Sequence, residues 1–135
     1  MPRLKPTRVD LEKLIFPNPT LKLTNAAAAR TDAINATSYT QIPGGLVYPA
    51  THSVKMITVL FVAECTASGQ LDARIKIGSK IANPSGMTLT QSSDLGTHSI
   101  SGWAENLPVG DILIAIECKG QGTVNNRNLS VWIYD

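Results

Sequence analysis

The C-terminal segment, residues 107–135, constrains the fold more than any other part of the chain. Apolar side chains occupy every second position of residues 112–118, and the same alternation returns in residues 129–133. Alternation at period two is typical of a β-strand with one face committed to a core. The stretch between the two runs, residues 120–128, is rich in Gly and Asn and predicts a polar loop. We therefore expect a hairpin of two strands at the end of a β-sandwich.

The remainder of the chain continues the same pattern in short apolar runs separated by Gly and Pro. No long helical pattern intervenes, and Asn83-Pro84-Ser85-Gly86 is a strong turn signal. Short strands at close spacing indicate an all-β fold, which we expect to be a jelly-roll-like antiparallel β-sandwich. Further strands are expected at residues 34–42, 54–65, 71–77, 87–91 and 98–103.

Residues 1–30 differ from the rest in both composition and charge. They contain four prolines and carry six Lys and Arg against two acidic residues, a net charge of +4. Residues 7–15 could form two helical turns, but so short a helix is marginal in water unless it packs on something. The alternatives are a tail without fixed structure and an arm that docks on a neighbouring subunit. We favour an extended N-terminal arm at residues 1–30 before a sandwich domain at residues 31–135, with docking anchors at Val9, Leu11, Leu14, Ile15 and Phe16.

The expected strand at residues 54–65 is apolar on both faces. A sheet with one wet face normally alternates apolar and polar residues, whereas burial on both faces is common in larger assemblies. Charged residues make up only 16% of the chain, which also indicates surfaces covered by partners. We therefore expect a homo-oligomer, whose interface would include Met56, Leu60, Val62, Trp132 and Tyr134.

No residue constellation in the sequence predicts catalysis. His52 and His98 each stand beside a serine, but neighbours on a strand point to opposite faces, and neither serine lies in a nucleophile elbow. Two cysteines and two scattered histidines lack the spacing of metal ligands. Cys65 and Cys118 are expected to be buried free thiols, with a disulfide between them as the alternative. We predict no enzyme, no metal and no cofactor.

Membrane and nucleic-acid partners are not expected either. No apolar run approaches the roughly 20 residues that cross a bilayer, and the N-terminus lacks the apolar region of a signal peptide. Aromatic residues make up only 5% of the chain, which leaves few platforms for base stacking. The arm is basic but has no Arg-rich block, so contact with packaged nucleic acid is the weaker alternative to protein docking.

The Asn-rich part of the expected loop is a candidate ligand site. Amides and a guanidinium near Trp103 or Trp132 could hydrogen-bond a sugar. The alternative is a plain turn, since asparagine tolerates left-handed backbone geometry. The residues of this ligand loop are Asn125, Asn126 and Arg127.

The end of the chain resembles the tumour necrosis factor/complement-type jelly roll, and especially its short versions in structural proteins of phages and other viruses. Leu107, Gly110 and Asp111 match a Leu-x-x-Gly-Asp turn before a core strand, and residues 129–134 match the closing strand. Residues 98–107 lie where the preceding strand of the family would run. The resemblance covers residues 54–135 and implies a homotrimer without a catalytic site; the scarcity of aromatic residues departs from the family.

Together these features predict a virion structural protein. Its expected task is to decorate or cement a capsid, with an oligomeric body, a trimer being favoured, and arms that dock on neighbouring shell subunits. It would be made in the host cytoplasm and lie on the capsid surface. The alternatives are a carbohydrate- or receptor-binding fibre head and a small jelly-roll capsid protein.

Overall fold

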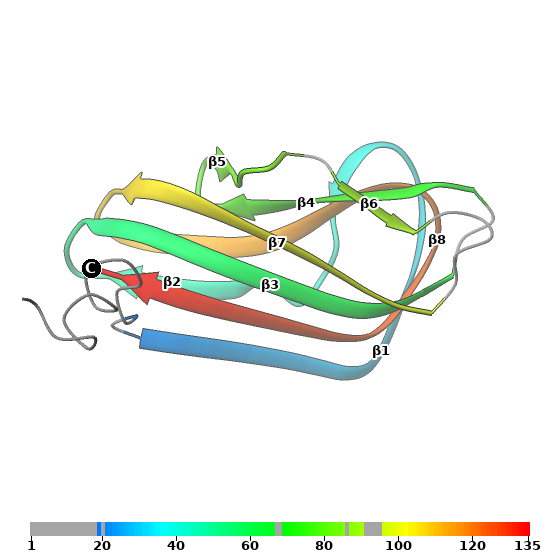
Figure 1. Ribbon diagram of the computed structural model, residues 1–135, viewed down its shortest axis with the longest axis horizontal. Coiled ribbons are helices and arrows are strands. Elements are labelled where there is room, and N and C mark those ends of the chain that lie inside the picture. Colours follow the sequence, from blue (N-terminus) through cyan, green and yellow to red (C-terminus); the bar gives the residue numbers. More distant parts are fainter. Residues whose placement is uncertain (1–18, 20, 67–68, 86, 91–95) are drawn as a thin grey trace, which may run out of the picture.

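The described part of the protein is built from antiparallel β-strands and contains no helix (Figure 1). The all-β, jelly-roll-like sandwich expected from the sequence is thereby confirmed. The five arm anchors, from Val9 to Phe16, lie outside the described residues. The structure is a computed structural model and describes residues 19, 21–66, 69–85, 87–90 and 96–135.

Eight strands form the sandwich, and two of them are much longer than the rest. In chain order they are β1 (Leu21–Gln41), β2 (Leu46–Ala50), β3 (Val54–Thr66), β4 (Leu71–Ile77), β5 (Lys80–Ile81), β6 (Met87–Thr90), β7 (Gly96–Leu107) and β8 (Gly110–Tyr134).

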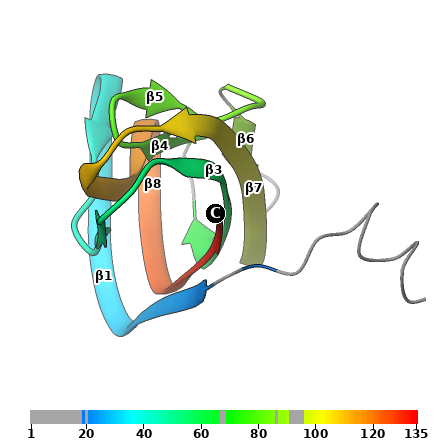
Figure 2. The same cartoon turned by 90° about the vertical axis from the view of Figure 1, so that its left-hand side faces the viewer.

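Strand β8 runs through both layers of the sandwich and is paired on both sides. Its first half lies between β4 and the run formed by the end of β1 and β2. Its second half lies between β3 and the first half of β1. The front layer in Figure 1 therefore has the order β7-β3-β8-β1, and the back layer contains β4, the first half of β8 and β2. Figure 2 shows the strands of the two layers around the core.

The bend that carries β8 from one layer to the other lies at Gly120. Its φ of 107° is in the left-handed region that favours glycine. The backbone of Gln70 approaches so closely that a Cβ at this position would overlap the Gln70 carbonyl oxygen. The glycine therefore permits both the turn of the strand and the close pairing with Leu71 of β4.

A β-bulge follows the bend and changes which residues of β8 face the core. Between its pairings with Val62 and Glu64 of β3, β8 has one residue more than its partner. Even-numbered residues up to Val124 point inward, whereas beyond the bulge the inward residues are odd-numbered, from Arg127 to Ile133. One extra residue reverses the alternation because the side-chain period of a strand is two.

Aliphatic side chains from both layers fill the core. Ile57 and Phe61 of β3 pack with Ile75 of β4 and with residues from both halves of β8. The most completely buried large side chains include Ile57, Leu71, Ile75, Ile77, Ile114, Val131 and Ile133. The core therefore lies wholly within residues 34–133.

Two expectations about local structure were wrong. Residues 107–135 do not form a hairpin, because the stretch expected as a loop is continuous with both strands and belongs to β8. The sandwich also starts earlier than residue 31, since β1 pairs with β8 from Leu21 onward. Gly and Asn in the middle of β8 mark a bend and a bulge, which use the same backbone tolerance as a turn.

Replacing Gly120 with alanine should destabilise the protein by at least about 2 kcal/mol, because both the positive φ and the approach of Gln70 oppose a Cβ. Urea denaturation of the variant would measure the loss. Gly69→Ala is the matched control, since a Cβ at Gly69 meets nothing within 4 Å. Equal stabilities of the two variants would contradict this account of the bend.

Candidate interaction surface

The outer face of the front layer carries both tryptophans of the chain. The strand register aligns Trp103 of β7, Thr58 of β3, Trp132 of β8 and Lys22 of β1 in one row across the sheet. The next row contains Ser101, Leu60, Ser130 and Thr24 in the same strand order. Side chains in register on one face of a sheet are neighbours. The two indole rings therefore flank the residue between them on β3.

A groove runs over β3 between the two tryptophans. Trp103 and Pro84 form one side and Trp132 the other, with Thr58 and Leu60 on the floor. Asn83 holds the Pro84 side in place, because it exchanges two backbone hydrogen bonds with Trp103, of 2.9 and 3.1 Å. The groove, called the tryptophan groove below, is lined by Met56, Thr58, Val59, Leu60, Pro84, Ser101, Gly102, Trp103 and Trp132.

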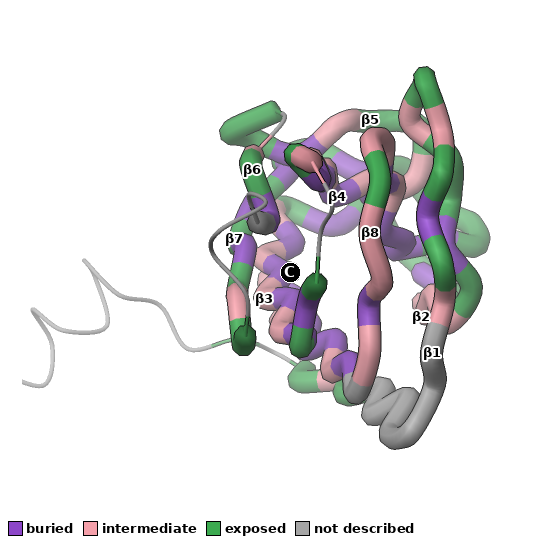
Figure 3. The backbone as a smooth tube through the Cα atoms, turned by 90° about the vertical axis from the view of Figure 1, so that its right-hand side faces the viewer, coloured by how far each residue is buried: buried purple, intermediate pink, exposed green. Residues whose placement is uncertain are grey.

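The expected interface residues all lie half-buried along this part of the sheet. Met56, Leu60 and Val62 of β3 alternate with fully buried neighbours, so the strand reads buried and intermediate without a fully exposed position (Figure 3). Trp132 and Tyr134 of β8 are equally half-buried and pair with Thr58 and Met56. Their placement on one apolar face is observed, while their role as an interface stays a prediction.

Charged groups border the groove at two places. The Lys22 ammonium lies 5.3 Å from the centre of the Trp132 ring, a cation–π contact that covers one side of the indole. Glu105 is paired with Met56 beside the Trp103 side of the groove and is exposed. A ligand of the groove would therefore meet an apolar floor with a cation at one border and a carboxylate at the other.

The outer face of the back layer has the opposite chemistry. Arg74 of β4 donates to Glu117 of β8 at 2.7 Å. Tyr39 lies against both the Arg74 guanidinium and the Lys119 ammonium, at 4.3 and 4.8 Å from the ring centre. Such a network of charged and aromatic groups is normal for a sheet face in water. The contrast indicates that the front face is the one suited to a partner.

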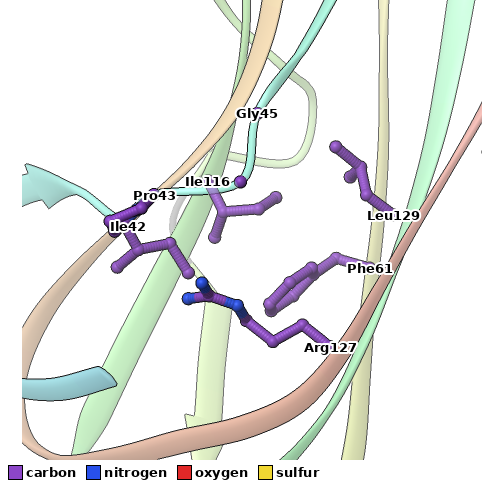
Figure 4. A pocket seen from close by; sticks show the side chains of 8 residues that line it. Ile42, Pro43, Gly45, Phe61, Ile116, Arg127 and Leu129 are labelled. Atoms are coloured by element: carbon purple, nitrogen blue, oxygen red, sulfur yellow. The ribbon is translucent and has the colours of Figure 1, made fainter. Parts of the chain in front are cut away.

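Arg127, expected on a ligand loop, is buried beneath the sandwich surface instead. Its side chain is only 3% exposed and forms an ion pair with Asp32 of β1, with 2.6 Å between the Nη2 and Oδ2 atoms. Figure 4 shows the guanidinium directed toward the segment that includes Ile42, in a small pocket also lined by Phe61 and Leu129. The bulge turns this residue inward, so the guanidinium is not presented to a surface ligand.

The two other residues of the expected ligand loop lie at the same bulge. Asn125 is half-buried in β8 and pairs with Thr31 of β1 and Glu64 of β3. Asn126 belongs to the described backbone of the strand. Because these residues are in the middle of a paired strand, they do not form a projecting tip next to Trp103 or Trp132. A role of the two asparagines in binding a sugar stays a prediction.

Trp103 and Pro84 were not identified from the sequence as members of one groove. Pro84 comes from the segment between β5 and β6, which pairs with β7 only through the isolated bridge at Asn83. The alternation of β7 did hold a signal, because Ile100, Gly102 and Ala104 are buried and require Trp103 to face outward. The sequence does not reveal that this outward face is shared with Trp132.

The polar groups of the described residues give little support for chemistry. His52 contacts Thr51, at 3.3 Å, and Asp135, at 3.2 Å, but its side chain is 60% exposed, so water screens the contact. No group of three or more potential metal ligands occurs among the described residues. The described residues also contain no helix long and apolar enough to cross a lipid bilayer.

Both cysteines are free and buried, as the sequence predicted. Burial raises the pKa of Cys65 to about 11 and, together with the proximity of Cys65, raises the pKa of Cys118 to about 12. The reactive form of a cysteine is the thiolate. At neutral pH both side chains therefore remain protonated thiols and act as small apolar groups of the core.

Comparisons with known proteins find similarity in structure only. No protein-family model and no curated protein sequence matches the chain. The PRD1 vertex protein P5 superimposes with a TM-score of 0.55 at 14% identity, and the match covers 87% of this chain and 99% of that one. Dimeric latent PorU from Porphyromonas gingivalis gives a TM-score of 0.53 at 10% identity, and the match covers 84% of this chain but only 12% of PorU.

Other neighbours with lower scores include the VP2 subviral particle of infectious bursal disease virus, with a TM-score of 0.47, 13% identity, and coverage of 84% of this chain and 32% of that one. At such low identities the likenesses with P5 and PorU show a shared β-sandwich fold. Viral capsid and vertex proteins therefore share the architecture expected from the sequence, while the tumour necrosis factor/complement-type family in particular is not among the similar structures found.

Replacing Asp32 with alanine should lower the free energy of unfolding by roughly 3 kcal/mol, because the buried guanidinium of Arg127 loses its carboxylate. Chemical denaturation followed by tryptophan fluorescence would measure the change. Asp111→Ala, at an exposed position of the same sandwich, is the control and should cost less than about 0.5 kcal/mol. Similar losses for both variants would contradict a structural role of the ion pair.

Proposed function

We propose that this chain is a virion structural protein that decorates or cements a capsid and has no enzymatic activity. Its sandwich forms the oligomeric body, with a trimer favoured, and its arm docks on neighbouring subunits of the shell. The protein is made in the host cytoplasm and acts at the capsid surface. The observation that carries the proposal is the half-buried apolar face of the front layer.

The apolar face is better suited to a protein partner than to water. Met56, Leu60 and Val62 occupy outward positions at which a solvated sheet usually carries polar side chains. Interfaces between proteins are enriched in Trp, Tyr and Met, and Trp132 and Tyr134 lie on the same face. The charged back face leaves the front face as the surface by which identical subunits would associate.

The fold likeness supports a place in a virus particle. PRD1 P5 is described as a vertex protein, and the match covers nearly its whole chain, whereas the match to PorU covers a small part of a longer protein. Fold alone does not determine function. The likeness gains weight because it coincides with a face suited to subunit contacts, as a component of a particle needs.

The arm supplies a second means of attachment. Burying one large apolar side chain stabilises a contact by roughly 1.5–3 kcal/mol before ordering costs, and the arm contains five such anchors. Arms joined through one oligomeric body act together, because binding of the first raises the effective concentration of the others. Several weak contacts would thereby hold the protein on a repetitive shell.

The first test concerns the oligomer. Leu60→Glu places a charge on the apolar face and should convert an oligomer into a monomer, as measured by light scattering during size-exclusion chromatography. Val47→Glu is the matched control, since Val47 is 52% exposed and lies on β2 in the back layer. A full-length chain that is monomeric at all accessible concentrations would refute the oligomeric body.

The second test concerns attachment to the particle. Deleting residues 1–20 should leave the sandwich folded, because the core lies within residues 34–133, but should abolish binding to shells that lack the protein. Co-sedimentation with such shells measures binding, and circular dichroism verifies the β-sheet fold. Binding retained without the arm would rule out arm-mediated cementing.

A further inference from the structure

We propose that the tryptophan groove is the docking site for the arm of a second copy of this chain. The inference rests on the proposed function and names the surface that receives the arm. Oligomers would then be held by arm exchange, with residues 9–16 of one subunit lying over β3 of the next. The apolar face and the apolar arm, each without an assigned partner, would be complementary.

The chemistry of the groove matches the composition of the arm. Its floor and walls are apolar or aromatic, and the arm places five apolar side chains within residues 9–16. Aromatic grooves are also a common receptor for proline-containing segments, and Pro17 follows the last anchor directly. The exposed Glu105 beside the groove can accept a hydrogen bond from Lys13 or Arg8 of the arm.

The position at which the arm joins the body places it close to the groove. The first strand begins at Leu21, and Lys22 is paired with Trp132, which forms one wall. Trp103 lies three strands away from Lys22, or about 14 Å at the usual strand spacing. Eight extended residues span up to about 28 Å, so residues 9–16 are long enough to cover the whole groove.

A second copy is favoured over the subunit's own groove. To reach its own groove, the chain would have to reverse direction within residues 17–20 and pass over the row of Lys22 and Trp132. Pro17 and Pro19 fix their own φ and bias the residues before them toward extended conformations. The Lys22 side chain already covers the Trp132 ring on this side. These features direct the arm away from its own sheet and toward a neighbour.

A mixing experiment with full-length variants tests the proposal. The arm variant, Leu11→Asp with Leu14→Asp, keeps the groove, and the groove variant, Leu60→Glu with Trp103→Ala, keeps the arm. Each should be monomeric alone. An equimolar mixture should double the mass to that of a dimer, because one intact arm meets one intact groove and neither chain can extend further.

Matched controls separate arm exchange from general effects of charge or folding. Arg3→Ala with Lys5→Ala alters the arm outside the anchors and should keep the oligomeric mass of the full chain. Trp103 is 41% exposed, so its replacement opens no core cavity. Unchanged circular dichroism and melting temperature would show that each variant is folded. Mixing the arm variant with a tagged copy of itself should give no dimer.

The outcomes also distinguish this inference from the proposed function. If the full chain and the arm variant have the same oligomeric mass, the faces pack directly; arm exchange is then overturned, while the oligomeric body stands. If the full chain is oligomeric but the mixture of monomeric variants does not associate, arm exchange is again overturned. A monomeric full chain would overturn both proposals.

A sugar is the other class of ligand that an aromatic groove can bind. Soluble oligosaccharides should leave the tryptophan fluorescence of the arm variant, whose groove is unoccupied by an arm, unchanged. A fluorescence change that saturates with one oligosaccharide and is lost with the groove variant, together with a mixture that stays monomeric, would assign the groove to a glycan and overturn the proposal.

Discussion

The pairing of β8 on both of its edges is the constraint on which the rest of the structure depends. Its backbone hydrogen bonds join the front layer to the back layer, because β3 and β4 lie on one side of it and the β1–β2 run on the other. A strand that serves both layers must bend without losing its partners. Gly120 provides the bend, and the bulge after it restores an inward-facing apolar series in the second layer.

The bulge has an energetic consequence that explains the buried ion pair. Reversing the alternation brings Arg127 to an inward position, and a charge in such a place is costly unless it is paired. Asp32 of the neighbouring strand β1 provides the carboxylate at 2.6 Å. The register between β1 and β8 is also irregular near this point, between Ala27 and Thr31. Charge pairing and irregular backbone therefore occur together where the two long strands cross between layers.

The fold class could be predicted from the sequence because period-two alternation depends only on local residue order. The apolar runs of β3, β4 and the two halves of β8 all indicated strands at the right places. The connection within β8 could not be predicted, since glycine and asparagine are favoured alike by turns, bends and bulges. The inward position of Arg127 depends on a single inserted residue, and the sequence contains no separate signal for the strand that supplies Asp32.

The candidate surface was predictable in part for a related reason. The outward apolar residues of β3 follow from alternation, so Met56, Leu60 and Val62 could be identified without a structure. Which strands lie beside β3 is a matter of long-range pairing, and this alone brings Trp103 and Trp132 to the same face. Long-range register thus converts two separate aromatic residues into one groove.

The two outer faces show how one fold can be given a direction in an assembly. Both layers use the same alternation to fill a common core, so the outward positions are free to differ without a cost to folding. The back face uses them for ion pairs and cation–π contacts around Arg74 and Tyr39, which remain favourable in water. The front face uses them for large apolar groups, which gain free energy only when a partner excludes water from them. A subunit built in this way associates through one face and leaves the other in solvent, which favours a closed cluster over an open aggregate.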